Sequence, residues 1–78
     1  MIKKEQKLII TFHTTTDAMA MEQVCKASGA EGRIIPVPPS ISAGCGLAWC
    51  AKPESESILR TLLETEKISF QEIQECFI

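Results

Sequence analysis

The sequence has few of the residues from which metal and phosphate sites are usually built. It contains one histidine, four cysteines and four glycines. No Cys-x-x-Cys pair occurs, so the ligand spacing of a structural zinc site is missing. Gly29 and Gly32 are too few and too far apart for a phosphate-binding loop. We therefore expect neither a metal nor another cofactor.

Long apolar runs and concentrated positive charge are also missing. No run approaches the roughly 20 apolar residues that span a bilayer. The charged N-terminus is followed only by the short apolar run Leu8-Ile9-Ile10, which lacks the features of a signal peptide. The net charge is -2 with both signs mixed along the chain, which argues against a nucleic-acid surface. We expect a cytoplasmic protein that binds neither membrane nor nucleic acid.

The chain of 78 residues suits one domain with a modest core. We expect a tail over residues 1–6 and a single domain over residues 7–78. A core this small favours added stability from a partner subunit. In the cytoplasm the cysteines are expected to stay reduced, with some inert in the core and one a candidate for a reactive thiol.

The hydrophobic pattern predicts four strands and two helices. The strands are expected at residues 7–13, 33–37, 47–51 and 73–77, and the helices at residues 15–28 and from 53 to 66 or 67. Thr14 is the expected N-cap of the first helix, with Asp17 at N3 and Gly29 as its stop. The expected buried stripes of the two helices are Ala18, Met21, Val24 and Cys25, and Ile58, Leu59, Leu62 and Leu63.

The order β-α-β-β-α-β favours one α+β architecture. Both helices must cover the same apolar face of a sheet, as in the split, ferredoxin-like arrangement. Its four strands are antiparallel in the order 4-1-3-2. A different α+β sandwich with the same elements is the less favoured alternative.

The segment from Pro38 to Gly46 does not resemble ordinary scaffold, because its cysteine stands between two glycines. In the predicted topology Cys45 lies near residues 12–14 and the first turn of the first helix. Free N–H groups and the helix dipole there would favour a thiolate. His13 is a candidate thiolate partner, and Gly44 and Gly46 would let another molecule approach the sulfur.

Structural explanations compete with this interpretation. Gly-Cys-Gly also suits a tight turn with an incidental cysteine, and a lone histidine at a strand end is usually structural. Thr14 is most simply a cap, while Ser40 and Ser42 are most simply turn formers.

The other cysteines separate by sheet or helix face. Cys25 is expected in the core, and Cys76 is expected to be structural or exposed. Cys50 alternates out of phase with Trp49, so it should face the open side of the sheet. A Cys45–Cys50 disulfide needs the loop to fold back, because five extended residues span about 16 Å. Cys50 is therefore at most a resolving thiol.

Several motifs together resemble the DUF3343 family of small bacterial proteins, which are described as selenium/sulfur carrier-like. The residues that carry the resemblance are Phe12-His13-Thr14, Asp17-Ala18 with Glu22, Ile34-Ile35-Pro36-Val37-Pro38, and Ser42-Ala43-Gly44-Cys45-Gly46-Leu47-Ala48. The resemblance covers about residues 8–77. It implies that Cys45 carries sulfur or selenium, framed by Gly44 and Gly46. The sequence departs from the family at Trp49-Cys50, where aliphatic and basic residues are expected.

The leading hypothesis is a carrier protein rather than a turnover enzyme. Cys45, with His13 as partner and Gly44, Gly46, Ser42 and Thr14 around it, would hold a persulfide or selenosulfide. The expected partners are a donor resembling a cysteine desulfurase and an acceptor of sulfur or selenium metabolism. One alternative is a thiol redox sensor or adaptor that uses Cys45 with Cys50 or a partner. Another is a non-catalytic interaction domain that forms a homodimer through its open sheet face or edge strand.

Overall fold

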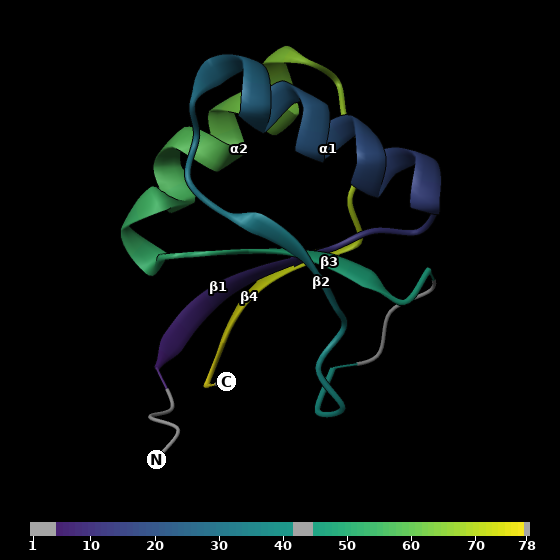
Figure 1. Cartoon of the computed structure of the whole chain (residues 1–78), viewed down its shortest axis with the longest axis vertical. Coiled ribbons are helices and arrows are strands. Elements are labelled where there is room, and N and C mark those ends of the chain that lie inside the picture. The colour runs from purple at the N-terminus through teal and green to yellow at the C-terminus, as the bar shows by residue number, and fades with distance from the viewer. Residues whose placement is uncertain (1–4, 42–44, 78) are drawn as a thin grey trace.

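The chain folds into one antiparallel sheet and a layer of helices (Figure 1). The computed structural model describes residues 5–41 and 45–77. Its elements are β1 (Gln6–Thr11), α1 (Thr15–Ser28), β2 (Arg33–Pro36), β3 (Leu47–Ala51), a 3-10 turn (Pro53–Ser55), α2 (Glu56–Thr65) and β4 (Glu72–Phe77). None of the helices within the described ranges is long and apolar enough to cross a membrane.

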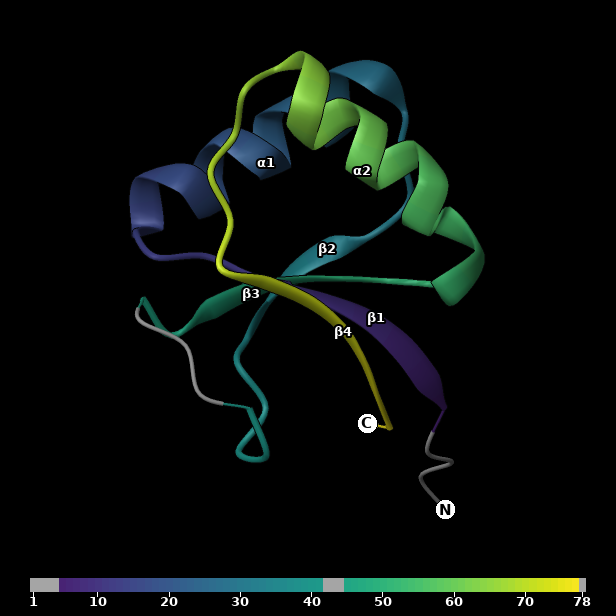
Figure 2. The ribbon, with the colours of Figure 1, turned by 180° about the vertical axis from the view of Figure 1, so that it is seen from behind.

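The strand order is β2-β3-β1-β4, which is the predicted order 4-1-3-2 counted from the other edge. Every neighbouring pair is antiparallel. Both helices lie on the same side of the sheet when the molecule is seen from the front or from behind (Figures 1 and 2). The predicted ferredoxin-like fold is therefore confirmed.

Strand alternation divides the buried side chains between two faces of the sheet. Leu8, Ile10 and Phe12 point to the helices and pack with side chains of both helices. We call this side the helix face. The other side, the open face, has a smaller buried cluster of Ile9, Ala48 and Cys50. Figures 1 and 2 show residues 37–41 on this open side, where Val37 and Ile41 pack against the cluster.

The ends of α1 are those that the sequence predicts. The Thr14 hydroxyl accepts the Asp17 N–H at 3.2 Å and donates to the Asp17 carboxylate at 3.0 Å. Gly29 ends the helix in the left-handed conformation, and its N–H bonds to the Cys25 carbonyl. The cap satisfies one donor at the helix start, and the glycine covers one acceptor at its end.

Some predicted boundaries were wrong by one to three residues. β1 begins at Gln6, inside the expected tail, and ends at Thr11 instead of residue 13. The chain leaves the sheet there because Thr14 must reach its capping position. β2 ends at Pro36, which has no N–H to donate to the ladder. Residues 53–55 form a 3-10 turn before α2 begins.

The predicted buried stripe of α2 was wrong at one position. Ile58 is 60% exposed, whereas Leu59 is fully buried and Leu63 nearly so. Leu59 and Leu63 are four residues apart and share one helix face, while Ile58 lies about 100° around the helix. The stripe is therefore narrower than the apolar sequence pattern suggests.

Candidate functional site

Cys45 lies immediately before β3, where the chain returns from the β2–β3 loop. Its side chain is half-buried and packs against the edge of the helix-face core. The Leu47 N–H donates to the Cys45 sulfur at 3.4 Å, and the thiol is 3.5 Å from the Leu47 carbonyl, to which it can donate. These two contacts fix the sulfur beside the backbone at the start of β3.

Gly46 gives this junction its shape. Its φ of 78° lies in the left-handed region that side chains rarely adopt, and among the described residues only its chain neighbours come within 4 Å of where a Cβ would be. The glycine is therefore required by the backbone turn and not by crowding. The Gly46 carbonyl accepts the Val37 N–H at 3.0 Å, which fastens the turn to the chain after β2. Cys45 thus sits on a turn that is tied to the sheet.

His13 and Thr14 lie at the same end of the sheet as Cys45, but within residues 5–41 and 45–77 neither forms a hydrogen bond with it. Thr11 pairs with Ala48, so the end of β1 and the start of β3 are adjacent. His13 and Thr14 are exposed beyond this pair. The Thr14 hydroxyl is occupied by the helix cap. A role for His13 or Thr14 in thiol chemistry stays a prediction. Ser42 and Gly44 lie outside the described residues.

Two of the other cysteines are buried on opposite faces of the sheet. Cys25 lies in the helix-face core, and burial raises its pKa from the ordinary 9.0 to about 11. Cys50 belongs to the open-face cluster, as its alternation with Trp49 predicts. Burial also raises the pKa of Cys50, while the positive charges of Lys7 and Arg33 act to lower it. Both thiols are therefore held mainly in the neutral form near pH 7.

Cys76, the fourth thiol, is half-buried at the margin of the open-face cluster. Its sulfur lies 3.5 Å from the Ser40 hydroxyl. This contact connects β4 to the start of the loop that carries Cys45. Sequence reasoning treated Ser40 only as a turn former and missed the contact, because 36 residues separate the two positions.

The geometry also bears on a disulfide between Cys45 and Cys50. Cys45 packs against the helix-face core, whereas Cys50 packs in the open-face cluster. The sheet lies between these two clusters. A disulfide requires Cα atoms within about 7 Å and Cβ atoms that point toward each other. An intramolecular bridge between these thiols would therefore require β3 to rearrange.

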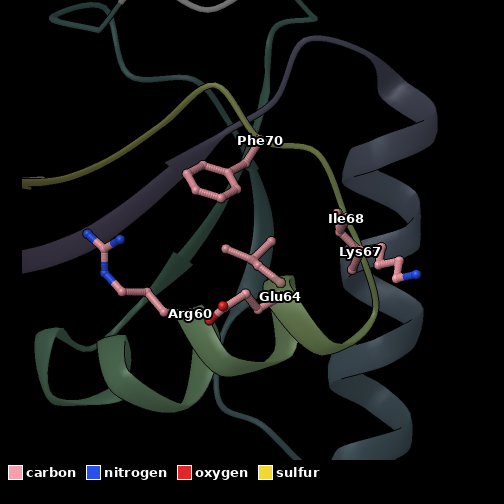
Figure 3. Close-up of a pocket in the computed structure, with 6 residues that line it drawn as sticks. Arg60, Glu64, Lys67, Ile68 and Phe70 are labelled. Atoms are coloured by element: carbon pink, nitrogen blue, oxygen red, sulfur yellow. The ribbon is translucent and has the colours of Figure 1, made fainter.

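One pocket lies away from all four thiols. It has a volume of about 410 Å³ and is lined by Arg60, Leu63, Glu64, Lys67, Ile68 and Phe70. Figure 3 shows Phe70 lying over α2 from the connection to β4, with Arg60 and Glu64 on the helix below. Its lining contains no cysteine, histidine or hydroxyl side chain. The pocket therefore offers no thiol, and its polar groups are the charges of Arg60, Glu64 and Lys67.

A second pocket was missed by sequence reasoning. It opens beside Cys50 on the open face and has a volume of about 240 Å³. Lys7 and Arg33 contribute positive charge to its lining. The signal that could have found it is strand register, because Arg33 pairs directly with Cys50. Without the register, a charged residue near the N-terminus and one at the start of β2 have no evident connection.

The fold and these positions define a small ferredoxin-like domain with a partly exposed cysteine two residues before a central strand. The chain belongs to the family described as "putative Se/S carrier protein-like", whose model matches residues 7–75. The resemblance drawn from the sequence motifs is thereby confirmed. No curated protein and no solved structure gave a match.

Proposed function

We propose that the protein carries one sulfur or selenium atom on Cys45 between partner proteins in the bacterial cytoplasm. The observation that carries this proposal is the contrast among its thiols. Cys25 and Cys50 are buried, whereas Cys45 is half-buried on a tied turn and has a backbone N–H aimed at its sulfur. Membership of the carrier-like family supports the same assignment.

The transfer step is a thiol exchange that needs no outside oxidant. The Cys45 thiolate attacks the terminal sulfur of a persulfide on the donor protein. A new S–S bond forms on Cys45, the donor's own S–S bond breaks, and the electron pair leaves with the donor thiolate. Selenium follows the same path when the donor holds a selenosulfide. The acceptor protein later attacks the terminal atom and restores the Cys45 thiolate.

This chemistry suits a carrier rather than a turnover enzyme. The protein contributes a partly exposed sulfur, a hydrogen bond from a backbone N–H and a turn tied to the sheet, while the partners supply the groups that make and use the persulfide. Within the described part of the chain, no residue beyond its neighbours crowds the Cβ position of Gly46, which supports the approach of a partner's active site to this side of the junction. We expect the donor to be a cysteine desulfurase or a similar enzyme of sulfur or selenium metabolism.

The test is loading by a cysteine desulfurase with cysteine as the sulfur source. Intact mass spectrometry should show the addition of one sulfur atom to the wild-type chain. The Cys45→Ala variant should gain none. Cys76→Ala is the matched control because Cys76 is also half-buried, and it should load as the wild type does.

Two results would overturn the proposal. One is an adduct of the same yield on Cys45→Ala, and the other is the absence of any adduct on the wild type when the desulfurase is active. A Cys45–Cys50 disulfide formed by mild peroxide at the same rate as loading would favour the redox alternative instead.

A further inference from the structure

The pocket beside Cys50 combines two cations and a buried thiol on the open face. Its lining residues are Lys7, Glu31, Gly32, Arg33, Cys50 and Ala51. Its volume of about 240 Å³ equals that of about eight water molecules at roughly 30 Å³ each. A compact oxyanion fits this space with water to spare.

Sheet register fixes the positions of the cations around the sulfur. Arg33 on β2 pairs directly with Cys50 on β3, so their side chains leave the same face about 5 Å apart at Cβ. On the other flank, Cys50 pairs with Ile9 of β1, and Lys7 lies two residues from Ile9 on the same face. Cys50 is therefore bordered by a cation on each neighbouring strand.

The charged side chains that line this pocket differ in whether they already have a hydrogen-bond or ion-pair partner. The Arg33 guanidinium has no hydrogen bond or ion pair to any residue within 5–41 and 45–77. Lys7 is paired with Glu5 at 3.1 Å, and its side chain is 27% exposed. Glu31 is turned to Lys52, accepting its N–H at 2.9 Å and lying 3.6 Å from its Nζ. Glu31 is thus ion-paired to Lys52 but still lines the pocket and acts to raise the pKa of Cys50. The two cations Lys7 and Arg33 outnumber this one acid of the lining.

The thiol of Cys50 is shielded from bulk solvent but borders the pocket. Cys50 is only 7% exposed yet lines the pocket. Its sulfur has no hydrogen-bond partner among the described residues. Cys76, the nearest other thiol by register, lies on the far side of β1. Two strand spacings of about 4.8 Å put their Cα atoms well beyond disulfide distance.

We propose that this pocket binds thiosulfate, a small sulfur oxyanion, between Lys7 and Arg33, and that Cys50 accepts its outer sulfur. The site would make the protein loadable by a small molecule on the open face. This goes beyond the carrier role of Cys45, which takes its cargo from a protein. The two sites lie on opposite sides of the sheet and can be tested separately.

The reaction balances without another reagent. The Cys50 thiol gives its proton to water, and the thiolate attacks the outer sulfur of thiosulfate. The S–S bond of thiosulfate breaks, and its electron pair leaves with sulfite. Cys50 becomes a persulfide. Lys7 and Arg33 hold the sulfonate oxygens and stabilise the charge that sulfite carries away.

The experiment incubates the reduced full-length chain with sodium thiosulfate and follows the addition of one sulfur by intact mass. The adduct should form on the wild type and on Cys45→Ala, and it should be absent from Cys50→Ala and Cys50→Ser. Arg33→Met should slow loading about tenfold or more, because a charge-assisted contact to the anion is lost. Arg60→Met, which removes an exposed arginine on α2, is the matched control and should load at the wild-type rate.

Inorganic sulfate distinguishes binding from sulfur transfer. It should slow loading by competition, and it should shift the backbone amide resonances at positions 33 and 51 in the wild type but not in Arg33→Met. An adduct that persists in Cys50→Ala overturns the proposal, as does loading that disappears in Cys45→Ala. Equal rates for Arg33→Met and Arg60→Met also overturn it. Because Arg33 is exposed, its substitution leaves the fold intact and keeps the test decisive.

Discussion

The two faces of the sheet bury a thiol in different surroundings. On the helix face, Cys25 is surrounded by the main core, and burial alone raises its pKa to about 11. On the open face, Cys50 is also buried, but Lys7 and Arg33 border it and oppose the rise in its pKa. One thiol is sealed among apolar groups, whereas the other lines a pocket with cations.

This difference shows how one residue type takes several roles in a chain of this size. Cys25 contributes volume to the core and behaves as a small apolar side chain. Cys50 is buried but reachable from a charged pocket. Cys45 lies at the margin of the helix face and has a backbone donor at its sulfur. Surroundings, rather than the thiol itself, separate packing from chemistry.

Substitutions in the core on the helix face should lower the free energy of unfolding the most. Leu59 is fully buried beneath α2, so Leu59→Ala should lower the free energy of unfolding by about 2–5 kcal/mol through the cavity it leaves. Ile58→Ala is the matched control on the same helix and should cost about 0.5 kcal/mol or less, because Ile58 is 60% exposed. Urea unfolding of both variants measures the difference. Equal costs would contradict the assignment of the buried stripe.

The raised pKa of Cys25 should make the folded protein less stable as the pH becomes alkaline. In the unfolded chain Cys25 loses its proton near pH 9.0, whereas in the folded chain it keeps the proton to about pH 11. The unfolded state is therefore favoured as the pH rises through this window, by up to about 2.7 kcal/mol for two pKa units. The measurement is urea unfolding at several pH values between 9.0 and about 11.

Cys25→Ala supplies the comparison for the pH experiment. It should be less stable than the wild type at neutral pH because a buried group is lost. Its free energy of unfolding should also fall less steeply between pH 9.0 and about 11. The fall that remains belongs to Cys50, whose pKa is raised by burial. The charged or titratable groups that act on Cys50 are Lys7, Arg33, Glu31 and Cys76. An unchanged slope in Cys25→Ala would mean that burial does not control this thiol.

Variants of Thr14 test whether its hydroxyl only caps α1 or also takes part in the chemistry of Cys45. Thr14→Ala should cost about 1 kcal/mol because the Asp17 N–H loses its acceptor. Thr14→Ser should restore most of this stability, since serine also caps well. If Thr14 is only a cap, Cys45 should load with sulfur at the wild-type rate in both variants. Slower loading in Thr14→Ala that serine restores would instead show that the hydroxyl also serves the thiol.

Replacing a side chain that packs against the open-face cluster should have the smallest effect on the free energy of unfolding. Ile41 is half-buried against the open-face cluster, so Ile41→Ala should cost at most about 1 kcal/mol. It should nevertheless raise the rate at which iodoacetamide modifies Cys50 or Cys76, and leave Cys25 protected. Mass mapping of the modified peptides distinguishes the faces. A faster reaction of Cys25 would contradict the division into two clusters.

Much of the fold could be predicted from the sequence because its local signals agree. The alternation of Leu8, Ile10 and Phe12 identifies the helix face of β1, and Thr14 with Gly29 delimits α1. Register could not be predicted, because it depends on which residues of distant strands pair. The pocket beside Cys50 and the Ser40–Cys76 contact depend on that pairing and were therefore missed.

The site was only partly accessible to sequence reasoning. The glycine beside Cys45 correctly indicated an unusual backbone, since Gly46 adopts a positive φ. The topology also gave the right end of the sheet for Cys45. The hydrogen bond from Leu47 could not be predicted, because it depends on how the turn brings the sulfur back over β3.

The central claim is that sulfur from a protein donor reaches Cys45 and not the buried thiols. The most direct measurement loads the wild-type chain with a cysteine desulfurase, alkylates it, and maps the persulfide to a peptide by mass spectrometry. The account predicts that the persulfide is found on Cys45, with Cys25 and Cys50 carrying none. A persulfide mapped chiefly to Cys50 or Cys76, with Cys45 unlabelled, would contradict it.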